Sequence, residues 1–155
     1  MSKLIQLEAL PDLLQKKQVV LANGCFDILH VGHLRYLQGA RALGDILVVA
    51  INSDRSVRAI KDSGRPILNE QERCTLLSAL ECVDYVVLFD EPDVSRVIQI
   101  LRPAIQAKGT DYSEETVPER EQVRAYGGAV RITGDSKEHS TRDIIRTIVD
   151  RISKP

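Results

Sequence analysis

The chain has 155 residues, of which 43% are hydrophobic and 28% are charged. This composition is typical of a globular domain and excludes a disordered or fibrous protein. Lysine and arginine number 21 against 22 aspartates and glutamates, which leaves a net charge of −1. Because duplex binding needs a basic field that this balance does not provide, we expect no nucleic-acid partner.

The longest uninterrupted apolar run, residues 46–51, is far shorter than the ~20 residues that cross a bilayer. The N-terminus shows neither the apolar core nor the cleavage site of a signal peptide. Cys25, Cys74 and Cys82 form no C-x-x-C pair, which argues against a disulfide framework and a zinc ribbon. We therefore expect a cytoplasmic protein with reduced thiols and no membrane partner.

The apolar pattern alternates between short continuous runs and helical spacings, as in α/β proteins. Residues 1–16 predict an amphipathic lead-in helix that is interrupted at Pro11. Residues 19–22 predict a buried strand, and a helix follows from about 32 to 42. Further strands are expected at 45–51, 85–89, 104–107 and 129–132.

The later helices are predicted from apolar spacing and from capping patterns. Apolar residues from Val94 to Leu101 recur at helical spacing and stop before Pro103. Three more helix starts have an oxygen acceptor three residues before a carboxylate: Asn69 with Glu72, Thr116 with Glu119, and Ser140 with Asp143. We expect the last helix to pack on the sheet through Ile144, Ile145, Ile148, Val149 and Ile152.

Strands that alternate with helices predict right-handed crossovers and an open parallel sheet. No internal repeat or linker divides the sequence, so we expect residues 1–155 to form a single domain. In such a sheet, ligands collect at the carboxyl ends of the strands.

The segment 23–33, Asn-Gly-Cys-Phe-Asp-Ile-Leu-His-Val-Gly-His, lies between the first strand and the first helix. Gly24 and Gly32 allow the backbone to approach a ligand, and the helix start attracts an anion. His30 and His33 can converge on one phosphate there. A cationic imidazolium would neutralise the charge that develops on a leaving pyrophosphate.

Two histidines at this spacing are also compatible with half a zinc site or with ordinary residues of a helix start. No further histidine or cysteine at ligand spacing completes a zinc site, so we expect no metal bound by the protein alone. The sequence contains neither a P-loop nor a dinucleotide-binding fingerprint.

The stretch from Gly24 to His33 resembles the H-x-G-H signature of the nucleotidyltransferase superfamily. Further blocks between residues 17 and 151 resemble the adenylyltransferases that make ADP-heptose for bacterial lipopolysaccharide precursors. They include Asn52-Ser53-Asp54, Arg65-Pro66-Ile67, Leu101-Arg102-Pro103, and Lys108-Gly109 with Asp111-Tyr112. The resemblance implies a Rossmann-like fold with helices on both faces of the sheet. It also implies that a sugar phosphate oxygen attacks the α-phosphorus of a nucleoside triphosphate and releases pyrophosphate.

The resemblance assigns roles to individual residues. The catalytic set is His30, His33, Lys61 and Arg73, in which Lys61 swings onto the phosphates and Arg73 clamps them. The nucleotide-binding set is Gly24, Cys25, Phe26, Gly32, His33, Lys108, Gly109, Asp111, Ser140, Thr141 and Arg142. The substrate-binding set is Asp27, Asn52, Asp54 and Arg65.

The last block departs from the family pattern. Relatives have Ser-Thr-Thr at the start of the final helix, whereas this chain has Ser140-Thr141-Arg142. Glycerol-3-phosphate cytidylyltransferases carry an arginine where this chain has Asp135, which weakens the cytidylyl interpretation. We expect Arg142 to contact a phosphate from its new position.

The resemblance therefore implies ATP and a phosphorylated sugar, such as D-glycero-β-D-manno-heptose 1-phosphate, as substrates. Mg²⁺ is expected on the triphosphate, where it keeps waters and takes few protein ligands. Relatives also imply a homodimer. One alternative is a cytidylyltransferase that uses CTP and glycerol 3-phosphate or another small alcohol phosphate. An alternative of another class is a nucleotide-sensing module that binds without turnover.

Overall fold

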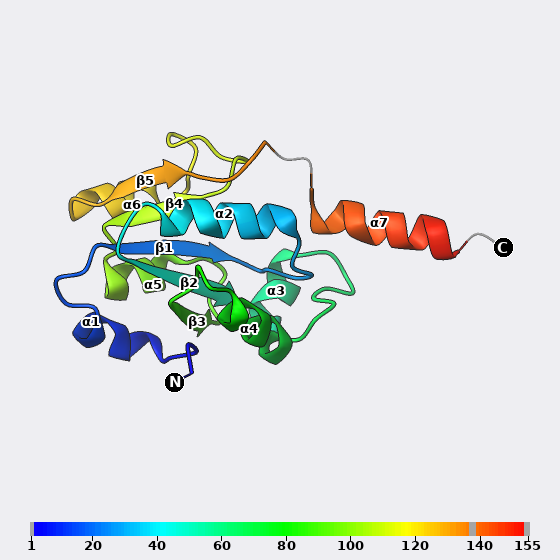
Figure 1. Cartoon of the computed structure of the whole chain (residues 1–155), viewed down its shortest axis with the longest axis horizontal. Helices are drawn as coiled ribbons and strands as arrows, with labels where there is room; N and C mark the ends of the chain where they lie inside the picture. The colour runs from blue at the N-terminus through cyan, green and yellow to red at the C-terminus, as the bar shows by residue number, and fades with distance from the viewer. Residues whose placement is uncertain (1, 137–138, 154–155) are drawn as a thin grey trace.

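The computed structural model describes residues 2–136 and 139–153. Five parallel strands form one sheet in the order β3-β2-β1-β4-β5 (Figure 1). The strands are β1 (Val19–Gly24), β2 (Ile46–Asn52), β3 (Tyr85–Phe89), β4 (Ile105–Lys108) and β5 (Ala129–Ile132). The predicted strands and their parallel arrangement are confirmed.

Helices cover both faces of the sheet. One face packs against α2 (Val31–Arg41) and α4 (Glu70–Ala79), which bury Leu37, Ala40, Cys74 and Leu77. The other face packs against α1 (Leu10–Leu13), α5 (Ser95–Leu101) and α6 (Arg120–Ala125). A 3₁₀ turn (Leu7–Ala9), α3 (Asp54–Ile60) and α7 (Thr141–Ile152) complete the elements. The α/β, Rossmann-like fold is therefore confirmed.

The central strand β1 lies at the switch point of the sheet. It pairs with β2 on one side and with β4 on the other, because the chain adds strands first in one direction and then in the opposite one. The connections on the two sides of this point diverge, and a crevice forms at the carboxyl ends of β1 and β4. The loop that carries the two histidines follows β1 directly.

Two of the three predicted helix caps are confirmed. The side chain of Asn69 accepts the Glu72 N–H and that of Ser140 accepts the Asp143 N–H. The prediction for Thr116 is wrong, because α6 begins only at Arg120. The Thr116 hydroxyl instead accepts the Ser113 N–H at 2.8 Å, within a turn.

The N-terminal segment packs on its own domain. Leu7, Leu10 and Leu14 are buried against the face of the sheet that α5 and α6 cover. Pro11 lies in the first turn of α1, where its missing N–H is not needed, so it starts this helix rather than interrupts one.

The last helix does not pack on the sheet, contrary to its predicted role. Every residue of α7, from 141 to 152, is exposed or half-buried, and Ile152 is 77% exposed. Figure 1 shows the helix extending away from the layered body. An apolar stripe thus predicted a helix correctly but did not predict what the stripe contacts. Within the described residues, no helix combines the length and apolar character needed to cross a bilayer.

Candidate active site

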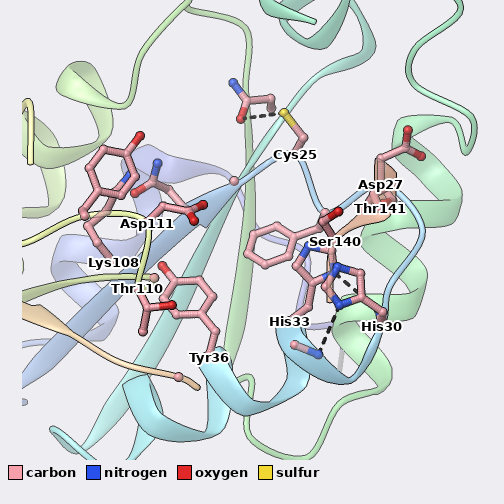
Figure 2. Close-up of a pocket in the computed structure, with 18 of the residues that line it drawn as sticks. Cys25, Asp27, His30, His33, Tyr36, Lys108, Thr110, Asp111, Ser140 and Thr141 are labelled. Carbon is pink, nitrogen blue, oxygen red and sulfur yellow. Dashed lines mark hydrogen bonds between the residues drawn. The ribbon is translucent and has the colours of Figure 1, made fainter. Parts of the chain in front are cut away.

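A cleft of about 750 Å³ opens at the carboxyl ends of β1 and β4. It is bordered by the loop after β1, the start of α2, the residues that follow β4 and the start of α7. Figure 2 shows His30 and His33 beside Ser140 and Thr141, with Lys108, Thr110 and Asp111 across the cavity. All of the predicted site residues line this cleft except Arg73 and Asp54.

His30 and His33 cap the start of α2 reciprocally. Nδ1 of His30 accepts the Gly32 N–H at 3.1 Å, and Nδ1 of His33 accepts the His30 N–H at 3.4 Å. The two rings stack with their centroids 3.8 Å apart. A Cβ on Gly32 would lie 2.9 Å from the His30 ring, so glycine is required for this packing. The H-x-G-H pattern therefore forms a capping box from imidazoles.

The His33 ring is a neutral hydrogen-bond donor. Burial, together with the neighbouring His30, lowers the pKa of His33 to about 4. Because Nδ1 accepts a hydrogen bond, the single ring proton lies on Nε2. His33 by itself therefore offers an N–H and no net charge at neutral pH. The cationic imidazolium expected beside a leaving pyrophosphate stays a prediction.

The loop after β1 has an unusual backbone that Asp27 stabilises. Phe26 and Ile28 have positive φ angles of 49° and 56°, which are costly for such side chains. The Asp27 carboxylate accepts hydrogen bonds from Arg65 Nε at 2.7 Å and from the N–H groups of Ile67 and Leu68. These contacts tie the segment 65–68 to the loop.

The predicted substrate contact through the Asp27 carboxylate is wrong. This side chain is 1% exposed, and its oxygens already accept three hydrogen bonds from the chain. Burial by itself raises the pKa of Asp27, but the hydrogen bonds from Leu68, Ile67 and Arg65 outweigh it and hold the pKa below its usual value. Asp27 therefore shapes the cleft and leaves contact with substrate to its neighbours.

Arg73 is a buried structural residue and does not clamp phosphates as predicted. Its side chain is fully buried. Nη1 donates to the carbonyls of Cys25 and Asn52 at 2.6 and 2.8 Å. Nε donates to the Leu68 carbonyl, and Nη2 donates to the Asp54 carboxylate at 2.8 Å. The Asp54 carboxylate is the counter-ion of Arg73 and does not line the cleft, so its role in binding sugar hydroxyls stays a prediction.

Cationic and hydroxyl side chains surround the histidines. Lys61 and Arg65 line the cleft on one side, and Arg142 lies at the start of α7. Arg142 forms an exposed ion pair with Asp62 at 3.3 Å. The Thr141 hydroxyl donates to the Asp27 carbonyl at 2.7 Å and so fixes the start of α7 to the loop after β1.

The end of β4 contributes a second group of residues. Lys108 is buried, with Nζ 4.7 Å from the centre of the Tyr112 ring. Burial lowers the pKa of Lys108, which the nearby Glu119 carboxylate partly offsets. A Cβ at Gly109 would meet nothing within 4 Å, so the backbone here is open to a ligand.

Residues 21–147 match the family model described as cytidylyltransferase-like. The chain belongs to this family. The family match indicates a nucleotidyltransferase, and the cleft described above is the candidate site for its chemistry.

The similar proteins include "Bifunctional protein HldE" of Syntrophotalea carbinolica, 49% identical over 155 residues. The match covers 97% of this chain and 32% of that protein. The protein of the same name from Citrifermentans bemidjiense is 54% identical over 133 residues, which cover 86% of this chain and 27% of that protein. The chain thus spans about a third of the length of these curated relatives.

Two solved structures have a fold similar to that of this chain. The lipopolysaccharide core biosynthesis protein from Thermoplasma volcanium superposes with a TM-score of 0.64 at 34% identity, covering 79% of this chain and 99% of that one. Pantothenate synthetase from Thermus thermophilus gives a TM-score of 0.68 at 16% identity, over 92% of this chain and 67% of the other. At this identity the second likeness concerns the fold alone.

Several lining residues of the cytidylyltransferase-like cleft were missed by sequence reasoning. Tyr36 lies one helical turn after His33, and its hydroxyl donates to the Ala107 carbonyl at 2.7 Å. The i, i+3 spacing from His33 was a signal that could have found it. Asn23 and Glu119 also line the cleft, but no local pattern indicates that β1 and α6 bring them together.

No three His, Cys, Asp or Glu side chains among the described residues are grouped so that they could hold a metal ion. Cys25, Cys74 and Cys82 are free thiols, and burial raises the pKa of each. The Cys25 thiol donates to the Asn52 side chain at 3.8 Å (Figure 2). These cysteines are therefore suited to packing and weak hydrogen bonding rather than to nucleophilic chemistry.

Proposed function

We propose that this nucleotidyltransferase transfers AMP from ATP to a sugar phosphate, such as D-glycero-β-D-manno-heptose 1-phosphate, and releases pyrophosphate. The observation that carries the proposal is the histidine pair that caps α2 inside the cleft. Similarity to the lipopolysaccharide core biosynthesis protein of Thermoplasma volcanium supports a sugar-containing acceptor.

In the proposed reaction, an oxygen of the sugar phosphate attacks the α-phosphorus in line. A bond forms between that oxygen and phosphorus as the bond to the bridging oxygen breaks, and pyrophosphate takes the electron pair. Because no covalent intermediate with the protein is needed, catalysis consists of positioning and charge stabilisation.

The histidines link the backbone N–H groups at the start of α2, where the helix dipole is positive, to the phosphates. Backbone N–H groups at the helix start donate to Nδ1 of His30 and His33, and the Nε2 side of each ring donates onward. Hydrogen bonding to Nδ1 polarises the ring and strengthens the Nε2–H donor. We assign the phosphate contacts to this pair together with Ser140, Thr141 and Arg142.

The remaining lining residues divide between the two substrates. We assign the nucleoside to Gly24, Cys25, Phe26, Gly32, Lys108, Gly109 and Asp111, which line one continuous surface. We assign Lys61 to the phosphates and Arg65 to the acceptor. The Asn52 side chain is buried and already bonded to Ser56 and Cys25, so it shapes the cleft.

Mg²⁺ is proposed to enter on the triphosphate. The described residues offer no cluster of three metal ligands, which fits an ion that takes phosphate oxygens and water as its main ligands. When bound, the ion supplies charge neutralisation on the phosphates.

The proposal is tested by measuring pyrophosphate release with ATP, CTP, GTP and UTP against several phosphorylated acceptors. We expect the highest kcat/KM with ATP and the heptose 1-phosphate. A preference for CTP and glycerol 3-phosphate would replace the proposal by the cytidylyl alternative. Nucleotide binding without pyrophosphate release for any acceptor would indicate a sensing module.

We also propose a cytoplasmic homodimer. The three free thiols support a reducing compartment, in which disulfides are rare. The exposed apolar side chains of α7, Ile148, Val149 and Ile152, give a reason to expect association, since burying such surface is favourable. Sedimentation velocity tests the proposal, and a monomer at micromolar concentration would contradict it.

A further inference from the structure

A second polar cluster borders the cleft on the face of the sheet opposite to the histidines. Gln106 of β4 lies beside Leu21 of β1, on the face that α5 and α6 cover. Asn23, two residues after Leu21, points to the same face, and Glu119 precedes α6 there. The histidines come from α2 on the other face, so the cleft joins two chemically different walls.

Gln106 orients the two lining residues of this cluster. Its side chain is fully buried, and its Nε2 donates to Glu119 Oε2 at 3.2 Å and to Asn23 Oδ1 at 3.5 Å. Its Oε1 is the buried side-chain polar atom that has no hydrogen-bond partner among the described residues. Buried amide oxygens without a partner are rare in native proteins.

Asn23 and Glu119 each have one polar group that does not bind Gln106. These two groups are a hydrogen-bond donor and a hydrogen-bond acceptor. Because Asn23 uses Oδ1 towards Gln106, it offers its Nδ2 donor to the cleft. Glu119 uses Oε2 in the same way and offers Oε1 as an acceptor. A hydroxyl group accepts one hydrogen bond and donates another, and so satisfies both. A phosphate would satisfy Asn23 but would be repelled by the Glu119 carboxylate.

We infer that Asn23 and Glu119 bind hydroxyl groups on the sugar of the acceptor, and that Gln106 is the residue that positions them. This inference rests on the proposed function, because it takes the acceptor to be a phosphorylated polyhydroxyl compound. Its phosphate lies towards the histidines and its hydroxyl groups lie towards α6. Lys108 follows Gln106 by two residues in β4 and faces the same side, so the hydroxyl-bearing part of the acceptor lies beside the nucleoside on this wall.

Calorimetric titration of the full chain with D-glycero-β-D-manno-heptose 1-phosphate tests this inference without turnover. In Glu119→Gln, the new side chain still has one oxygen that can accept the hydrogen bond from Gln106. Its other polar group, which faces the cleft, changes from an acceptor to a donor. We expect this variant and Asn23→Ala each to bind the sugar phosphate at least about tenfold more weakly, while the affinity for a non-hydrolysable ATP analogue stays within about twofold. Glu121→Gln is the matched control, because Glu121 lies two residues further along, in α6, with a side chain that is 75% exposed.

Equal sugar phosphate binding by wild type, Glu119→Gln and Asn23→Ala would overturn the inference. A loss of ATP-analogue affinity in place of sugar affinity would also overturn it, as would a wild type that binds no sugar phosphate. Failure of the proposed function has a different signature, namely sugar phosphate binding without pyrophosphate release. Circular dichroism of each variant identifies one that fails to fold, and the other variant then decides the result.

Discussion

His33 accepts the backbone N–H of His30 at 3.4 Å through Nδ1, and the two rings stack at 3.8 Å. This relationship makes the pair one unit, because moving either ring uncovers a backbone donor at the start of α2. It also assigns the proton of the neutral His33 ring to Nε2. The same contacts that stabilise the helix therefore prepare a donor for phosphate.

The low pKa of His33 predicts a dependence of stability on pH. The pKa falls from an ordinary value of 6.5 to about 4 on folding, so the unfolded chain binds a proton first as pH decreases. The contribution is fully present above pH 6.5 and is lost progressively towards pH 4, and it amounts to about 3 kcal/mol. Urea unfolding of wild type and His33→Asn at several pH values measures it. Identical pH profiles for the two proteins would contradict the prediction.

Arg73→Lys tests the structural assignment of Arg73. Lysine keeps the charge but cannot reach the carbonyls of Cys25 and Asn52 and the Asp54 carboxylate together, so we expect a loss of about 3 kcal/mol in the free energy of unfolding. Arg55→Lys is the control, because its ion pair with Asp90 is exposed and its effect should stay below about 0.5 kcal/mol. Unchanged stability with weakened ATP binding would restore the original prediction of a phosphate clamp.

Arg142→Ala tests whether Arg142, which replaces the second threonine of the family's Ser-Thr-Thr, contacts a phosphate. The ion pair of Arg142 with Asp62 is exposed and weak, so the guanidinium can turn to a bound triphosphate at little cost. We expect ATP affinity to fall by about tenfold or more, as for the loss of one charge-assisted hydrogen bond. Arg146→Ala, on the same helix but outside the cleft, should change nothing. Unaltered ATP affinity in Arg142→Ala would exclude the contact.

Ile148→Ser examines the position of α7. Since Ile148 is 48% exposed within its own chain, its replacement should change the free energy of unfolding of the monomer, measured at a concentration too low for the proposed dimer, by less than about 0.5 kcal/mol. Leu37→Ala, in the core between α2 and the sheet, should cost about 2–5 kcal/mol by comparison. Thermal and urea unfolding measure both. A loss for Ile148→Ser comparable to that of Leu37→Ala would show that α7 packs on the protein after all.

The strands were predictable because a strand buried on both faces leaves a continuous apolar run, as in 46–51 and 85–89. The caps at Asn69 and Ser140 were predictable because the acceptor and the N–H it binds lie three residues apart. The pattern at Thr116 was misleading, since the same hydroxyl can accept an N–H within a turn. The capping pattern therefore predicts a helix start correctly only where the backbone after it continues as a helix.

The cleft was predictable in part. The loop after β1 carries its own glycines and histidines, and the parallel sheet determines where it opens. The roles of Arg73 and Asp27 were mistaken, because a charged residue that is buried and fully hydrogen-bonded looks the same in the sequence as one that faces a ligand. Asn23 and Glu119 were missed because they are 96 positions apart in the chain and meet only through the packing of α6 against the sheet.

The most direct test of the account is the rate of pyrophosphate release from ATP and heptose 1-phosphate in His30→Asn and His33→Asn. Asparagine retains a hydrogen-bonding side chain at the start of α2 but cannot extend an N–H to the phosphates. With circular dichroism unchanged, the account predicts that kcat falls by about a hundredfold or more in each variant. Rates close to wild type in both folded variants would contradict the claim that this histidine pair carries the chemistry.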